Sequence, residues 1–70
     1  MREEIETLAE RVVSENQALA RDAAAGVPKT WGALAARGIV ALKERLRRAP
    51  TEAERRAMWD ALWRALHGSG

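Results

Sequence analysis

The residues of this 70-residue chain that are best suited to bind a ligand are basic and surround one turn. One group ends an expected helix, and two more arginines lie one turn into the next helix, beyond Ala49-Pro50-Thr51. Arginine and lysine side chains supply most of the protein contacts to nucleic-acid phosphates. The cluster therefore predicts a surface for RNA. Its members are Lys43, Arg45, Arg47, Arg48, Arg55 and Arg56.

The same basic cluster also has an ordinary structural interpretation. Cations are common at helix C-termini because they complement the negative end of the helix dipole. Glu44, Glu52 and Glu54 stand among the basic residues and dilute their charge. Glu52 also precedes Arg56 by four residues, which is the spacing of a surface ion pair on a helix. RNA binding is therefore an alternative and not the leading hypothesis.

A second candidate set is suited to contact with another protein. Tryptophan and arginine are enriched at binding hot spots, and Trp59, Trp63 and Arg64 are close neighbours in one expected helix. Val40 points away from the apolar seam of its own expected helix. Core packing is the commoner fate of tryptophan at helical spacing, and that interpretation stays open. The predicted interaction residues are Val40, Met58, Trp59, Trp63 and Arg64.

The sequence contains no recognisable catalytic constellation. Its one histidine, His67, stands near the expected end of a helix, and the chain has no cysteine to join it in a metal site. Ser14 and Ser69 lie in no nucleophile motif, and the glycines form no phosphate-binding loop. We therefore expect no enzyme, no cofactor, no metal and no small-molecule substrate.

Length and composition limit the size of the core. Seventy residues make one domain, and without cysteine no disulfide can stabilise it. Alanine supplies much of the apolar fraction, and it favours helix while burying little area. A thin core in a short chain favours self-association or docking on a partner.

The net charge of +2 conceals an uneven distribution. Residues 1–26 hold three basic and six acidic side chains, whereas residues 27–50 hold six basic and one acidic. The chain begins Met-Arg-Glu-Glu, unlike a secretory signal, and no apolar run is long enough to span a bilayer. We expect a soluble cytoplasmic protein. Arginine outnumbers lysine ten to two, as in some thermostable proteins.

Three helices are expected, over residues 2–25, 28–48 and 52–67. Gly26 suits the end of the first helix, Pro28 the start of the second and Pro50 its end. Thr51-Glu52-Ala53-Glu54 is a capping box for the third helix. Because the connections are short, neighbouring helices must run antiparallel. We predict an all-α, up-down-up three-helix bundle over residues 1–67, with oligomers left open, and a flexible tail or cloning remnant at 68–70.

The antiparallel order predicts particular contacts. Trp31, at the start of the second helix, should approach Trp63 and Leu66 near the end of the third. Gly38 lies in the middle of an apolar seam, where its missing side chain suits the close approach of another helix. Asn16 interrupts the stripe of the first helix. It is either buried with hydrogen-bond partners or in contact with water at the bundle edge, and we favour the edge.

One stretch carries a family resemblance. Residues Val12–Leu34 read VVSENQALARDAAAGVPKTWGAL, a pattern of two apolar residues, Glu-Asn, Asp, Ala-Gly-x-x-Lys and Gly-x-Leu. The stretch resembles the helical tail domain of the B subunit of tRNA-dependent amidotransferases and of small free-standing proteins with that domain. The resemblance implies an all-helical, tRNA-contacting appendage without an active site. Beyond this stretch the chain departs from the pattern at residues 36–39. The matching residues are Glu15, Asn16, Asp22, Ala25, Gly26, Lys29, Gly32 and Leu34.

The leading hypothesis is a non-catalytic helical protein-interaction or self-association module, whose partner is a second copy or another protein. The alternative is an RNA-binding appendage that uses the basic cluster. A further alternative is a designed helical bundle without a natural function.

Overall fold

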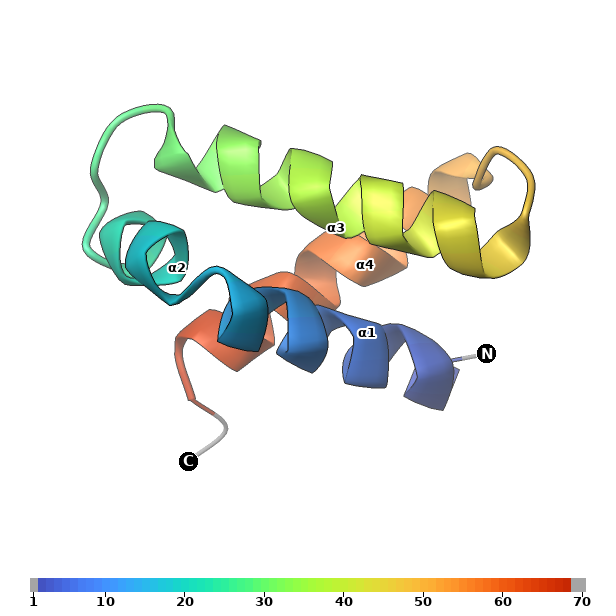
Figure 1. Ribbon diagram of the computed structural model, residues 1–70, viewed down its shortest axis with the longest axis horizontal. Helices are drawn as coiled ribbons and strands as arrows, with labels where there is room; N and C mark the ends of the chain where they lie inside the picture. Colours follow the sequence, from blue (N-terminus) through green and yellow to red (C-terminus); the bar gives the residue numbers. More distant parts are fainter. Residues whose placement is uncertain (1, 69–70) are drawn as a thin grey trace.

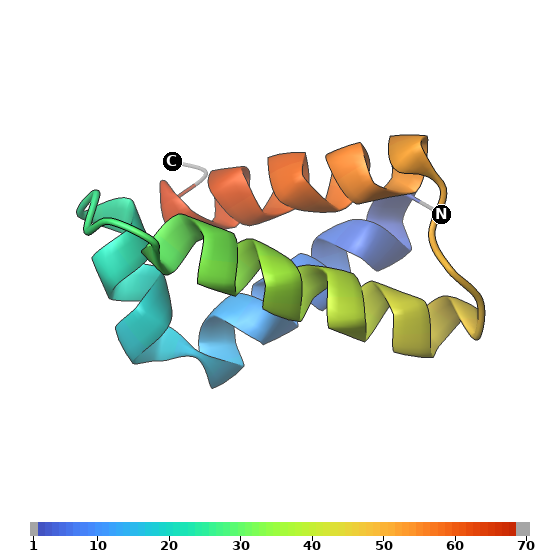
Figure 2. The same ribbon diagram turned by 90° about the horizontal axis from the view of Figure 1, so that it is seen from above.

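The computed structural model describes residues 2–68, and within that range the chain is all-α, with no strand. Figure 1 shows α3 lying above α1, with α2 seen nearly end-on and α4 behind them. Figure 2 shows α4 beside α3 and running in the opposite direction. α4 packs against both α1 and α3, and α2 packs mainly against α3. The four helices are α1 (Arg2–Glu15), α2 (Gln17–Ala24), α3 (Thr30–Leu46) and α4 (Glu52–Leu66).

The predicted three-helix bundle is wrong because the first helix, expected over residues 2–25, is two helices that separate at Asn16. Asn16 has φ −131° and ψ 50°, outside the helical region. Its side-chain Nδ2 donates to the Val12 carbonyl oxygen at 2.8 Å, and its backbone N–H donates to Val13 instead. The amide side chain thus takes the acceptor that the backbone N–H would use in a continuous helix. The half-buried Asn16 ends α1 and lets α2 leave in a new direction.

Three of the four described residues with positive φ set the end of α2 and both ends of α3. Gly26 has φ 81° and lies at the end of α2, where the sequence predicted a helix end. The Val27 N–H closes this end by donating to the Asp22 carbonyl oxygen at 3.0 Å. Lys29 has φ 72°, so α3 begins at Thr30 and not at Pro28. Arg47 has φ 60°, so α3 ends at Leu46 and not at residue 48. A left-handed residue cannot continue a right-handed helix, which explains both corrections.

The remaining boundaries are close to the expected ones. α4 begins at Glu52 as predicted and ends at Leu66, one residue before the expected end. Of the tail predicted at 68–70, Gly68 is described and residues 69–70 lie outside the described residues. No helix of residues 2–68 is both long and apolar enough to cross a membrane.

The core lies where α1, α3 and α4 meet. No polar or charged side chain of the described residues is buried. Met58 is completely buried, so its predicted place on an interaction surface is wrong, because it faces α3 and fills the space beside Gly38. The fully buried large side chains are Leu34, Leu42, Met58 and Leu62.

The predicted close approach of α3 to another helix at Gly38 is confirmed. A Cβ atom added at Gly38 would lie 2.6 Å from Leu62 Cδ1 and 3.1 Å from Met58 Cγ. The predicted approach of Trp31 to Trp63 is also confirmed, with ring centroids 5.7 Å apart and planes at 88°. This edge-to-face geometry is favourable for indoles. Together the two contacts set the register between α3 and α4.

The two glycines inside α3 allow a matched test of this close approach. Alanine at position 32 meets no atom within 4 Å, so Gly32→Ala should stabilise the fold by about 1 kcal/mol through helix propensity. Gly38→Ala gains the same propensity but must displace Leu62 and Met58, and overpacking typically costs about 1–3 kcal/mol. We expect Gly38→Ala to be less stable than the parent chain. Urea denaturation of both variants measures the difference, and equal stabilisation at the two positions would contradict the close contact.

Candidate interaction surface

Two of the three tryptophans lie on the surface of α4. Met58 and Leu62 are buried, and Trp59 and Trp63 each follow one of them by a single residue. One residue turns a helix by about 100°, so both indoles stand at the edge of the buried face. Trp59 is 39% exposed and Trp63 is 52% exposed. Core packing therefore does not account for these two side chains.

Trp63 is held by two aromatic neighbours. The half-buried Trp31 of α3 meets it edge to face, and the His67 ring lies 4.1 Å from it at 52°. An aromatic side chain that is already ordered loses little conformational freedom when it binds. Trp59 stands one helical turn away on the same stripe of α4. We call Trp31, Trp59 and Trp63 the aromatic face.

The other two predicted interaction residues lie elsewhere. Val40 is 56% exposed on α3, at a shallow hollow that Lys43, Glu44, Arg47 and Arg48 also line. Arg64 donates to Asp60 at 2.7 Å and to Glu6 of α1 at 3.3 Å. Arg64 thus joins α4 to α1, while Trp63 contacts α3. The structure does not bring Arg64 together with the aromatic face.

Half of the basic cluster is engaged in ion pairs. Arg45 pairs with Glu4 across the molecule, Arg48 pairs with Glu54 and Arg56 pairs with Glu52. The Glu52–Arg56 pair, 3.5 Å long, has the spacing noted in the sequence. The Arg45–Glu4 pair had no sequence signal, because only the tertiary arrangement brings the start of α1 to the end of α3.

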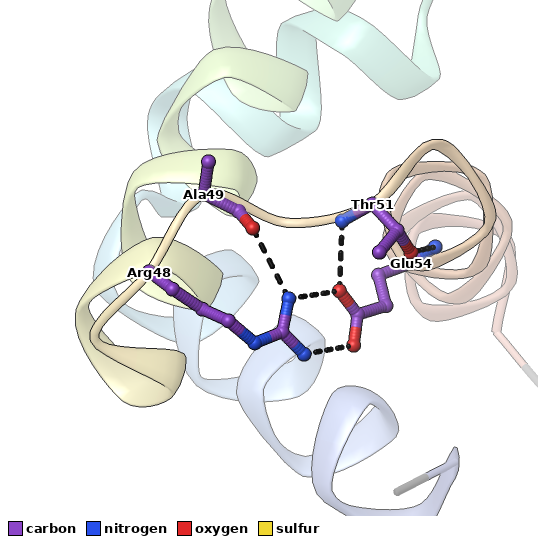
Figure 3. A network of polar contacts seen from close by, with 4 residues as sticks. All are labelled: Arg48, Ala49, Thr51 and Glu54. Atoms are coloured by element: carbon purple, nitrogen blue, oxygen red, sulfur yellow. Dashed lines mark hydrogen bonds and ion pairs between the residues drawn. The ribbon is translucent and has the colours of Figure 1, made fainter.

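Arg48 belongs to a network that closes the turn before α4, shown in Figure 3. Its guanidinium donates to both Glu54 oxygens, at 2.9 and 2.8 Å, and to the Ala49 carbonyl oxygen at 3.1 Å. The Thr51 N–H donates to Glu54 Oε1 at 2.8 Å, and Thr51 Oγ1 accepts from the Glu54 N–H at 3.2 Å. These last two bonds confirm the predicted capping box. Arg48 thus holds the turn.

The network shifts the titration of both its charged groups. Hydrogen bonds from Arg48 and from the Thr51 backbone lower the pKa of Glu54 from its ordinary 4.5 to about 2. The hydrogen bond to Glu54 raises the pKa of Arg48 above its ordinary value. Both shifts favour the charged pair, as expected for a two-pronged contact between guanidinium and carboxylate.

Three members of the basic cluster remain without an ion-pair partner among residues 2–68: Lys43, Arg47 and Arg55. All three side chains are exposed. Over the same range, no three histidine, aspartate or glutamate side chains gather closely enough to hold a metal ion. The described surface therefore offers exposed indoles and free cations as its distinctive chemical groups.

Comparisons with protein-family models, with curated proteins and with solved structures found no match to this chain. The resemblance of Val12–Leu34 to the amidotransferase tail domain therefore stays a prediction from the sequence.

The lowered pKa of Glu54 predicts a specific pH dependence of stability. A carboxylate with a folded-state pKa near 2 and an ordinary value of 4.5 stabilises the fold fully above pH 4.5. This contribution is lost as the pH falls through 2. The difference in unfolding free energy between the parent chain and Glu54→Gln should therefore be constant near neutrality and shrink from pH 4.5 to 2.

Urea denaturation between pH 2 and 7 measures this difference. Glu52→Gln is the matched control, because it removes one charge from a side chain that is about two-thirds exposed. A difference for Glu54→Gln that stayed unchanged down to pH 2 would show that the Arg48–Glu54 network does not hold in solution.

Proposed function

We propose that this chain is a non-catalytic helical module that binds another protein through the aromatic face. The observation that carries the proposal is the exposure of Trp59 and Trp63, one helical turn apart on α4. Two exposed indoles one helical turn apart are unusual on a surface without a partner. Tryptophan is also the residue type most enriched at the energetic centres of protein interfaces.

The exposed part of these indoles is large enough to matter for affinity. Covering about 100 Å² of each ring would contribute roughly 2–3 kcal/mol per ring, at about 25 cal/mol per Å². Part of that gain is offset by the entropy lost on association. Trp63 reduces this cost because Trp31 and His67 already hold its ring. The aromatic face therefore has the character of an anchor site.

The RNA-binding alternative has weaker support. Arg45, Arg48 and Arg56 each have a carboxylate partner, so a phosphate would have to compete for them. Lys43, Arg47 and Arg55 remain for phosphate contacts. Three contacts give only a shallow dependence of affinity on salt and weak binding at physiological ionic strength.

Site-specific photocrosslinking tests the proposal. Benzoylphenylalanine in place of Trp59 keeps an aromatic group at the surface and reacts with whatever covers it. In cells that make the chain naturally, we expect irradiation to give a protein adduct of defined mass that withstands nuclease. The same reagent in place of Thr7, exposed on α1, is the control and should give no such adduct.

The proposal would be wrong if position 59 gave no protein adduct, or if its adduct were removed by nuclease. Identical adducts from positions 59 and 7 would show random collision instead of docking. Circular dichroism of both labelled chains establishes beforehand that the helices are intact.

A further inference from the structure

We infer that the partner of the aromatic face is an acidic amphipathic helix, which inserts apolar side chains over the indoles and places carboxylates on Lys43 and Arg55. The inference rests on the proposed function and adds the chemistry of the partner. It depends on where the register of α3 and α4 puts the free cations.

Both cations lie at the same level of the α3–α4 pair. Gly38 faces Met58 and Leu62, and the two helices run antiparallel. On α3, Lys43 lies five residues after Gly38. On α4, Arg55 lies five residues before the midpoint between Met58 and Leu62. At 1.5 Å per residue, each lies roughly 7–8 Å beyond the contact, toward the same end.

Lys43 and Arg55 also lie on the side of the molecule that carries the indoles. Ala41 and Glu44 of α3 line the groove against α1. Lys43 follows Ala41 by two residues, which turns it by about 200° around α3, to the outer edge of the helix where it also lines the hollow beside Val40. Arg55 precedes Trp59 by four residues and Trp63 by eight, so these three residues form one stripe on α4. The aromatic face is therefore bordered by two cations.

The charges of this border select the chemistry of the partner. Lys43 and Arg55 have no ion-pair partner within residues 2–68, and neither cation neutralises the other. A carboxylate between them would interact favourably with both, and electrostatic complementarity of this kind sets specificity and association rate. Trp59 and Trp63 are about 6 Å apart along α4, a spacing that suits apolar anchors one turn apart on a docked helix.

A second copy of this chain does not provide such a surface. A two-fold dimer through the aromatic face would bring a second Lys43 and a second Arg55 to the same interface, which doubles its positive charge and is unfavourable. The acidic helix of the chain, α1, exposes only polar side chains and so cannot cover indoles. Those side chains are Arg2, Glu3, Glu4, Thr7, Glu10, Arg11, Ser14 and Glu15.

A single-stranded nucleic acid also fits less well. Nucleic-acid bases stack on the flat faces of aromatic rings. The Trp63 ring already has the His67 ring at 4.1 Å and Trp31 edge to face, so other rings already occupy part of the surface on which a base would stack. An aliphatic side chain needs no such parallel approach. The geometry therefore favours a protein segment.

A peptide selection tests the inference without knowledge of the natural partner. The full chain is immobilised and exposed to a displayed library of random 20-residue peptides. Peptides that also bind the Trp59→Ser variant are first removed, so that those kept need the Trp59 indole. We expect the enriched peptides to have a net negative charge, with carboxylates next to apolar residues spaced three and four apart. Circular dichroism shows whether Trp59→Ser keeps the helical fold.

Charge reversal supplies the quantitative test on a selected peptide. Lys43→Glu with Arg55→Glu should weaken binding about tenfold or more, the effect of losing roughly 1.4 kcal/mol. Arg21→Glu with Arg37→Glu is the matched control, because both arginines are exposed and unpaired among the described residues. The control should change binding by less than about twofold, since its charges lie away from the bound peptide. Neither double variant removes an ion pair of the fold.

The possible results separate the inference from the proposed function. Peptides that depend on Trp59 but are neutral or basic, or equal losses in the two double variants, would overturn the acidic partner and leave protein binding standing. If sedimentation equilibrium shows a dimer that Trp59→Ser abolishes, the partner is a second copy of the chain. That result would also overturn the acidic partner and leave protein binding standing. If no selected peptide needs Trp59 for binding, but the binding of bulk tRNA does need Trp59, both the inference and the proposed function are wrong.

Discussion

The close approach of α3 and α4 at Gly38 is the contact on which the arrangement of this small protein depends. Because no side chain stands at Gly38, Met58 and Leu62 reach the backbone of α3 and are fully buried. Helical geometry then turns Trp59 and Trp63 outward by about 100° from those two residues. The same contact that completes the core therefore exposes the indoles, and core packing and the candidate site have a common cause.

The break at Asn16 shapes the other side of the molecule. A continuous helix over residues 2–25 would carry the alanine-rich segment past the end of the core. With the Asn16 side chain bonded to the Val12 carbonyl oxygen, α2 turns away, and its Ala20 and Ala23 become buried. Those small side chains permit close packing of α2 against α3. One local hydrogen bond thus decides how the first third of the chain contributes to the core.

Ion pairs join the helices at the surface and leave unpaired positive charge in one region, near the indoles. Arg45 joins α3 to α1, Arg64 joins α4 to α1, and Arg48 ties the α3–α4 turn to the first turn of α4. Each such exposed pair stabilises the fold little. Their larger effect is on recognition, because they engage three cations of a basic cluster that acidic residues already dilute in the sequence. The free cations that remain near the indoles are fewer and more localised.

Local signals in the sequence determined the helical class, the capping box at Thr51, the helix end at Gly26 and the close approach at Gly38. These follow from backbone geometry and short-range spacing, which neighbouring residues control. The tertiary structure decided what depends on competition or distance. Asn16 broke a helix whose apolar stripe ran through it. Of two neighbours in one apolar arc, Met58 is fully buried whereas Trp59 stays 39% exposed at the edge of the buried face. The Arg45–Glu4 pair joins residues that no local pattern connects, because only packing decides which faces of the helices meet.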